Sequence, residues 1–150
     1  MEENDLDKAA LVHAEAFPRQ RQSKKWLFWS IRAVPRTLCY VVEQDNQIHG
    51  YIIWAQKSGF RPEAVVELEQ IAVHPHQQNT GIGQYLIEQS LEMVKQQLLQ
   101  NGSTVKHILV NTRADNHAQK IYRKVLGAEV EATISNLFSA DEVYMVARNV

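Results

Sequence analysis

The sequence holds few of the residues that mark specialised protein classes. Cys39 is its only cysteine, which excludes an internal disulfide and a zinc site built from cysteines, and fits a reducing compartment. Six glycines and four prolines among 150 residues are too few for a collagen-like or low-complexity chain. The formal net charge of -1 provides no overall attraction to nucleic acid or to an anionic membrane. We therefore expect neither as a partner.

Long apolar runs are also missing. No uninterrupted apolar stretch has the length needed to cross a bilayer. The first residues, Met1-Glu2-Glu3, are acidic, whereas a secretory signal begins with basic residues and continues into an apolar stretch. These features predict a cytoplasmic protein. A hydrophobic fraction of 45% and a length of 150 residues predict one globular domain over residues 1–150.

Hydrophobic periodicity predicts a mixture of helices and strands. Ser23 is the expected N-cap of the second helix, and Pro35 follows its end. The expected elements in chain order are helices at 6–17 and from 23, strands at 37–43, 48–54 and 65–73, a long helix opened by Thr80 or Gly81, a strand at 108–110, a helix at 116–125, and strands near 130–134 and 143–147. A hairpin followed by a strand–helix–strand crossover predicts an α/β fold whose mixed sheet has helices on both faces.

The most informative segment is the polar turn at residues 74–81, which lies between a strand and the long helix. A helix N-terminus presents unpaired N–H groups and a partial positive charge, so it stabilises a pyrophosphate without a lysine. Gly81 and Gly83 would let a ligand approach the backbone, and Gln78 and Asn79 add side-chain donors. The two glycines alone are more typical of an ordinary helix cap. The turn has neither the Gly-Lys-Ser/Thr ending of a Walker loop nor a complete Rossmann fingerprint.

Two motifs together resemble the GNAT superfamily of acetyl-CoA-dependent N-acetyltransferases. The family's loop, Arg/Gln-x-x-Gly-x-Gly/Ala, is matched at Gln78, Gly81 and Gly83. Residues 115–128 look like the family's second segment, which carries Asn, Ala, Tyr and Gly. The resemblance covers nearly the whole chain. It implies the GNAT fold, a mixed central sheet flanked by helices in a single domain, with a first strand that is short or absent here.

The resemblance implies acetyl transfer from acetyl-CoA, the cosubstrate, to a primary amine by direct attack on the thioester. The amine must lose a proton before it attacks, and protonation helps the thiolate to leave. Glu67 and Glu69 alternate along the strand at 65–73, so both are expected on one face as candidate bases, and a solvated strand face is the alternative. The resemblance favours Glu69 over Glu67. Tyr122 is the implied general acid toward the CoA sulfur, and core packing is its alternative role.

The resemblance also implies where CoA binds. The end of the third strand supplies backbone contacts for the pantetheine arm and a donor for the thioester carbonyl. The family's Asn position falls on Asp115, and we favour the adjacent Asn116, because a carboxylate is less favourable near phosphates. The full expected set is Ile71, Ala72, Val73, Gln78, Asn79, Thr80, Gly81, Ile82, Gly83, Gln84, Asn116 and Tyr122.

Other polar and aromatic clusters have simpler interpretations. His74-Pro75-His76 has no third ligand nearby, so it predicts a solvated turn and no metal site. A basic cluster between the first two helices is a solvated loop, or a contact for an acidic substrate or for the CoA 3′-phosphate; it consists of Arg19, Arg21, Lys24 and Lys25. Trp26, Phe28 and Trp29 cannot all face the core from one helix. They would line an acceptor pocket or form a homodimer contact.

The identity of the acceptor is not encoded in any motif of the chain. Small-molecule amines, protein N-termini and lysine side chains all fit the expected chemistry. A CoA-binding regulatory domain of the same fold, without catalytic activity, is the alternative function. Acetyl transfer to a panel of amines separates the two, because a pure binder has affinity for CoA and no turnover.

Overall fold

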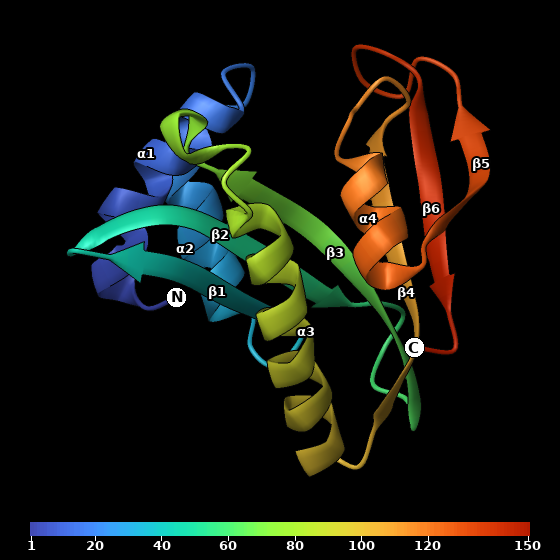
Figure 1. Ribbon diagram of the computed structural model, residues 1–150. Helices are drawn as coiled ribbons and strands as arrows, with labels where there is room; N and C mark the ends of the chain where they lie inside the picture. The colour runs from blue at the N-terminus through green and yellow to red at the C-terminus, as the bar shows by residue number, and fades with distance from the viewer. The chain divides into compact units, whose positions relative to one another are not determined.

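The computed structural model describes residues 1–150, whose six strands form one mixed sheet (Figure 1). The strand order is β1-β2-β3-β4-β6-β5. The elements in chain order are a 3-10 helix η1 (Glu3–Asp5), α1 (Leu6–Ala16), α2 (Ser23–Arg32), β1 (Thr37–Gln44), β2 (Gln47–Gln56), β3 (Glu63–Val73), a 3-10 helix η2 (Pro75–Gln77), α3 (Ile82–Gln100), β4 (Thr104–Arg113), α4 (Gln119–Leu126), β5 (Glu129–Ile134) and β6 (Glu142–Arg148). This architecture confirms the predicted single-domain α/β fold, and no strand precedes α1.

Backbone contacts within the domain group into two compact units. The first contains Met1–Ala55 and Gln70–Val94, and the second contains Gln56–Glu69 and Lys95–Val150. The end of β3 and the start of α3 therefore belong to the first unit.

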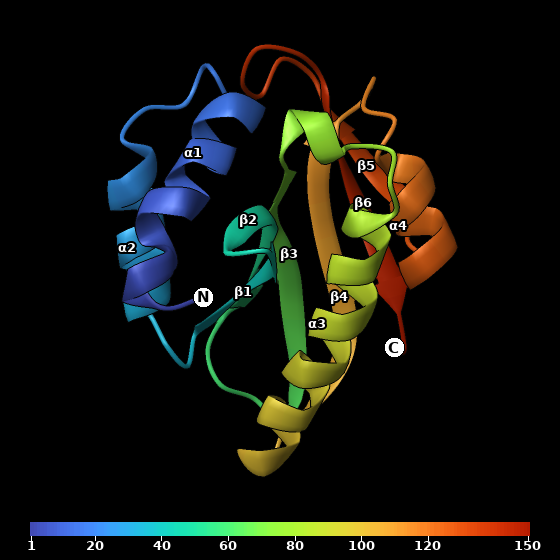
Figure 2. The same ribbon diagram turned by 60° about the vertical axis from the view of Figure 1, so that its left-hand side comes forward.

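The first unit is organised by the β1–β2 hairpin. Its turn residues Asp45 and Asn46 have φ values of 52° and 60°, the left-handed backbone that a tight hairpin turn requires. Alternation along β2 then separates two faces. The core beside α1 and α2, two helices that lie side by side in Figure 2, includes Tyr51 and Ile53 together with Leu6, Ala9, Val12 and Leu27. Trp54 belongs to the opposite face, where its Nε1–H donates to Ser90 Oγ of α3 at 2.8 Å.

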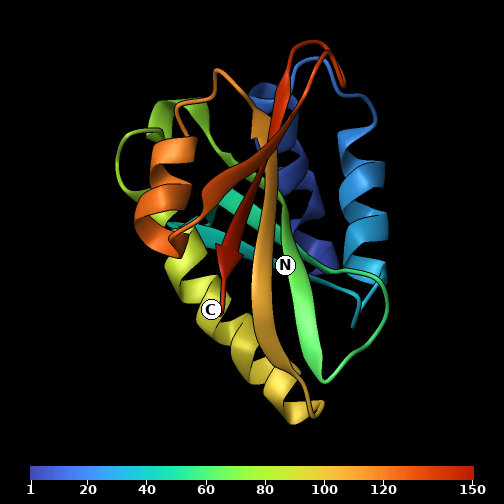
Figure 3. The same ribbon diagram turned by 90° about the vertical axis from the view of Figure 1, so that its right-hand side faces the viewer.

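The second unit contains the parallel part of the sheet. Residues Glu63 to Leu68 of β3 pair in parallel with Thr104 to Val110 of β4, and Figure 3 shows the two strands running side by side. β6 pairs antiparallel with β4 on one edge and with β5 on the other. α4 packs against β4, and it ends at Gly127, which takes the left-handed φ of 66° that suits a C-cap.

Some element boundaries differ from the prediction. Ser23 is not the N-cap of α2: that position falls on Gln22, while the Ser23 hydroxyl is 2.9 Å from Nδ1 of His13. α3 begins at Ile82, directly after Gly81 as predicted, whereas β4 extends well beyond residues 108–110 at both ends. The helix predicted from residue 116 begins at Gln119, because the side chain of Asn116 bonds a local backbone N–H and favours a turn over a helix.

The aromatic residues of α2 are divided between core and solvent, as predicted. Leu27 is fully buried, Phe28 is half-buried, and Trp26 and Trp29 are 44% and 60% exposed. None of the helices combines the length and the apolar character required to cross a membrane.

Candidate active site

The turn at residues 74–81 is held in shape by its own hydrogen bonds. The N–H of Gln77 donates to the carbonyl of His74 at 2.7 Å, within the segment that contains η2. The Thr80 hydroxyl donates to the Gln77 carbonyl at 2.6 Å, and Nε2 of Gln78 donates to the Val73 carbonyl at 3.2 Å. The turn is therefore an ordered continuation of β3.

Two residues with left-handed backbone lead from this turn into α3. Asn79 has φ of 62° and Gly81 has φ of 91°. The Gly81 carbonyl accepts from the N–H of Tyr85 at 3.0 Å, so Gly81 is the residue at which α3 starts. The backbone N–H groups that follow it, from Ile82 on, belong to the first turn of a helix and lack intrahelical partners.

The space around the two glycines is open on the protein side. A Cβ atom at Gly81 would have no neighbour within 4 Å, and one at Gly83 would meet only Val73 Cγ2, at 3.8 Å. Packing within the protein therefore does not explain the absence of side chains here. Gln84, the next predicted contact, donates through Nε2 to Glu88 at 2.8 Å along the helix.

The end of β3 presents backbone and half-buried side chains. Ile71 and Val73 are half-buried, whereas Ala72 is 4% exposed and packs with the core of the first unit. The carbonyl oxygen of Ala72 lies 2.8 Å from where a Cβ atom would stand at Gly50. Of the three predicted residues, Ala72 has its side chain committed to the core.

The two candidate bases are in different situations. Glu67 forms an ion pair with Lys57, with Nζ 2.7 Å from Oε2, and its side chain is only 14% exposed. The expected alternative of a solvated strand face is therefore wrong for Glu67. Glu69 is half-buried on the same strand.

Tyr122 is 5% exposed on the inner side of α4. Burial raises its pKa to about 12, because desolvation disfavours the phenolate. The hydroxyl is thus protonated at neutral pH and available as a proton donor. Burial of the ring equally supports the packing role that the sequence left open.

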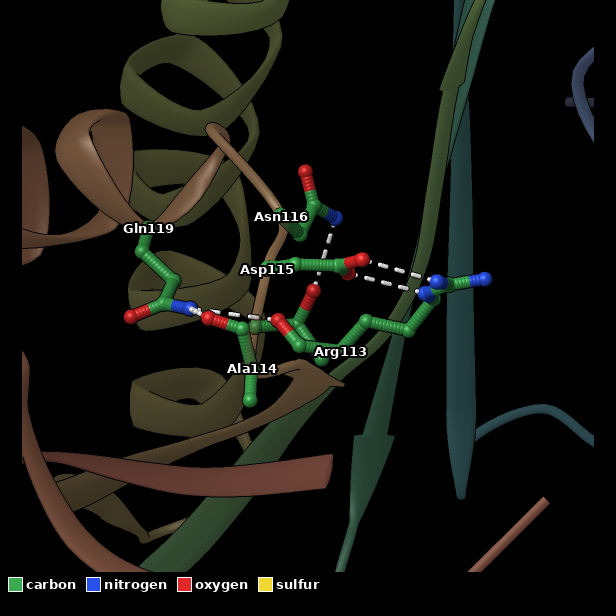
Figure 4. Close-up of polar contacts among 6 residues, drawn as sticks. Arg113, Ala114, Asp115, Asn116 and Gln119 are labelled. Carbon is green, nitrogen blue, oxygen red and sulfur yellow. Dashed lines mark hydrogen bonds and ion pairs between the residues drawn. The ribbon is translucent and has the colours of Figure 1, made fainter. Parts of the chain in front are cut away.

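The turn before α4 decides what Asp115 and Asn116 do (Figure 4). Arg113 donates to both carboxylate oxygens of Asp115, at 2.9 and 2.8 Å, and these bonds lower the pKa of the Asp115 carboxyl. Asn116 donates through Nδ2 to the Thr112 hydroxyl at 2.8 Å, and its Oδ1 accepts from the N–H of Ala118 at 2.9 Å. The negative charge of Asp115 is thus balanced by Arg113, and the Asn116 side chain stabilises the turn.

Two buried polar residues near this turn have no counterpart among the predicted site residues. Gln119 is buried, and its Nε2 donates to the carbonyls of Arg113 and Ala114 at 3.1 and 2.9 Å (Figure 4). Glu142, which pairs with Arg113 across β4 and β6, is buried, and burial raises its pKa. A charged residue at the start of a strand resembles ordinary loop sequence, so no local signal distinguishes it.

Gln70 is a further residue that the sequence did not mark, and its side chain makes three hydrogen bonds. Its Oε1 accepts from the Tyr51 hydroxyl at 2.7 Å and from Nε1–H of Trp26 at 3.0 Å. Its Nε2 donates to Oε1 of Gln20 at 3.2 Å. The single amide therefore joins β2, β3, α2 and the connection between α1 and α2.

No group of three or more metal-ligating side chains is present in the chain. His74 and His76 lie with ring centroids 5.4 Å apart and nearly stacked.

The third strand of the mixed sheet leads through a glycine-containing turn into a helix, which is the arrangement expected from the resemblance to the acetyltransferases. The model of the Acetyltransferase (GNAT) family matches residues 5–128. The chain belongs to this family of acetyl-CoA-dependent N-acetyltransferases.

Solved structures of acetyltransferases share the fold. A ribosomal-protein-alanine N-acetyltransferase from Brucella melitensis has 18% identity and a TM-score of 0.77, with 99% of this chain and 96% of that chain covered. The ribosomal-protein-S18-alanine N-acetyltransferase from Escherichia coli has 22% identity and a TM-score of 0.69, covering 99% and 90%. An aminoglycoside 6'-N-acetyltransferase complexed with coenzyme A has 12% identity and a TM-score of 0.75, covering 97% and 91%. No sequence among the curated proteins matches the chain.

Proposed function

We propose that this chain, over residues 1–150, transfers an acetyl group from acetyl-CoA to a primary amine by direct attack of the amine on the thioester. The observation that carries the proposal is the turn at residues 78–83. Asn79 and Gly81 bend the backbone into α3, and the first N–H groups of that helix have no side chain at Gly81 or Gly83 in front of them. The pyrophosphate of CoA binds there, because a helix N-terminus stabilises an anion.

The remaining cofactor contacts follow from the ends of β3 and α4. Backbone groups of Ile71 and Val73 bond the pantetheine arm and the thioester carbonyl. The pairing of β3 with β4 supports this role, because it ends at Leu68 while β3 continues to Val73. Asn116 acts on the cofactor through the turn that it stabilises, since both ends of its amide are engaged.

Glu69 and Tyr122 carry the proton transfers. The amine nitrogen attacks the carbonyl carbon, the C–S bond breaks, and the amine proton passes to Glu69 directly or through water. We favour Glu69 over Glu67, as the resemblance implies, and the Glu67 carboxylate is held in an ion pair with Lys57. The Tyr122 hydroxyl, protonated at neutral pH, donates to the departing thiolate.

The acceptor class is defined here only as a primary amine. The names of the similar structures include aminoglycoside, ribosomal-protein-alanine and phosphinothricin acetyltransferases. At sequence identities of 12% to 22%, this similarity shows a shared fold and not a shared acceptor. Small-molecule amines and protein N-termini or lysines are therefore the acceptors to compare.

The test measures CoA thiol release from acetyl-CoA with a panel of amines, with mass spectrometry to detect the acetylated product. Turnover with at least one amine, and none in its absence beyond slow hydrolysis, is the expected result. CoA binding by calorimetry without turnover on any amine of the panel would instead support a regulatory CoA-binding domain. Absence of both binding and turnover would contradict the proposal outright.

A further inference from the structure

A side-chain contact joins α1 to the turn at residues 74–81. Oε2 of Glu15, in the last turn of α1, lies 3.2 Å from Nε2 of His74, the first residue of that turn. The backbone of α1 also contacts η2 within the first unit. The two side chains are 49% and 27% exposed, so the pair is partly shielded from solvent.

The same imidazole ring makes a second bond through its other nitrogen. The backbone N–H of His76 donates to Nδ1 of His74 at 3.3 Å, which caps η2. Nδ1 is the acceptor of this bond, while Nε2 faces the Glu15 carboxylate. One ring therefore links the helix α1 to the backbone of the turn.

The main chain of His74 is anchored as well. Its N–H donates to the carbonyl of His49 on β2 at 2.8 Å. The bonds farther along the turn, such as those from Thr80 and Gln77, connect residues of the turn to each other and set its shape. The contact with Glu15 instead fixes the place of the turn against α1.

We propose that Glu15 and His74 are positioning residues that hold the 74–81 turn in its CoA-binding place. The inference rests on the proposed function of that turn. A turn that is already held needs less ordering when the pyrophosphate binds, so the contact between Glu15 and His74 increases affinity for the cofactor. Neither residue takes part in proton transfer, so loss of the pair raises KM for acetyl-CoA and leaves kcat and the acceptor KM unchanged.

Substitutions at His74 separate its two bonds. His74→Asn keeps an acceptor for the N–H of His76 but is too short to reach Glu15. His74→Gln keeps a donor that reaches Glu15 but loses the acceptor that caps η2. For His74→Asn and Glu15→Ala we expect KM for acetyl-CoA, and the Kd for CoA, to rise by about three- to fivefold, the range for a partly exposed pair. Glu15→Gln retains an oxygen that accepts from Nε2–H, so it restores most of the affinity.

Asp7→Ala is the matched control. Asp7 is also on α1 and pairs with Lys24 at 2.6 Å, without a contact to the turn. Asp7→Ala should leave the KM for acetyl-CoA and the Kd for CoA at their wild-type values. In the double variant Glu15→Ala/His74→Asn the affinity should fall no further than in either single variant, because both remove the same contact.

Calorimetric titration with CoA, circular dichroism and steady-state kinetics decide the outcome. If the wild type binds CoA and Glu15→Ala binds it equally tightly with a normal spectrum, the positioning role is wrong and the proposed function stands. If Glu15→Ala lowers kcat and melting temperature with no selective effect on KM, the pair is merely structural and the proposal is likewise overturned. If the wild type itself does not bind CoA, the proposed function fails, and this inference fails with it.

Discussion

The carbonyl oxygen of Ala72 lies 2.8 Å from the position that a Cβ atom would take at Gly50, so β2 and β3 approach here more closely than any side chain at residue 50 permits. The same Cβ would stand 3.0 Å from Cδ1 of Leu86 on α3. Gly50 is therefore enclosed between a strand and a helix, directly beside the end of β3 that leads to the 74–81 turn.

Gly50→Ala should destabilise the protein, since the Ala72 carbonyl is backbone and cannot rotate away. Overpacking of this kind costs about 1–3 kcal/mol. For a domain of this size each 1 kcal/mol lowers the melting temperature by roughly 2–4 °C. Thermal unfolding followed by circular dichroism measures the change, and Gly83→Ala, where the nearest contact would be 3.8 Å, serves as the control with little change. Equal melting temperatures for wild type and Gly50→Ala would show that the two strands separate at little cost.

Gly81→Val should weaken CoA binding at least tenfold while the fold survives, because a branched side chain would stand between the phosphates and the helix N-terminus. Gly59→Val is a closely matched control. Gly59 has φ of 90° against 91° for Gly81, and a Cβ atom at either position would have no neighbour within 4 Å, so both variants bear the same backbone strain. Calorimetry on both variants separates strain from ligand contact. Equal losses of CoA affinity in Gly81→Val and Gly59→Val would show that the 74–81 turn is not part of the cofactor site.

Glu69→Gln should lower turnover at neutral pH more than Glu67→Gln does, because glutamine keeps the shape and has no basicity. Glu67→Gln also removes the charge partner of Lys57, at an expected cost to stability of up to about 1 kcal/mol. Initial rates and melting temperatures on both variants distinguish loss of a base from loss of an ion pair. Wild-type turnover in Glu69→Gln would assign the base to another residue or to water.

Tyr122→Phe should reduce turnover by about 10²-fold, the low end of the range for a general acid, with little change in CoA affinity. The pKa of Tyr122 is raised to about 12 in the folded protein, against about 10 in an unfolded chain. Its hydroxyl therefore contributes stability that is fully present below pH 10 and is lost as pH rises toward 12. Tyr122→Phe should not show this loss of stability at alkaline pH. Urea unfolding of both proteins between pH 9 and 11 measures the difference in the free energy of unfolding. A normal rate combined with a lower melting temperature would make Tyr122 a packing residue.

His13 should make the protein sensitive to acid. Burial lowers the pKa of His13, an effect that the nearby amide of Gln20 partly offsets. Because the unfolded chain takes up a proton near pH 6.5 and the folded one resists it, the free energy of unfolding should fall as pH drops below about 6.5. His13→Leu, which cannot titrate, should show a flatter profile between pH 7 and 5 in urea unfolding. Parallel profiles for the two proteins would assign the acid sensitivity to other groups.

Signals confined to neighbouring residues determined much of the fold. The alternation of the strands at 37–43 and 48–54, with Asp45 and Asn46 between them, was sufficient for the hairpin, because turn chemistry and period-2 patterning are local. The apolar stripe of the long helix and the glycines at its start were equally local. The motif at residues 78–83 was therefore enough to locate the candidate cofactor turn.

Contacts between residues far apart in the chain were decided only by the tertiary structure. Nothing near Glu67 in the sequence indicates Lys57 as its partner, and a glutamine at residue 70 has no local mark of its bonds to Trp26 and Tyr51. Side-chain partners depend on strand register and helix packing, which sum over the whole chain. The sequence by itself thus determined the order of the elements and located the candidate cofactor turn, and the packing of those elements decided which side chains from distant segments meet.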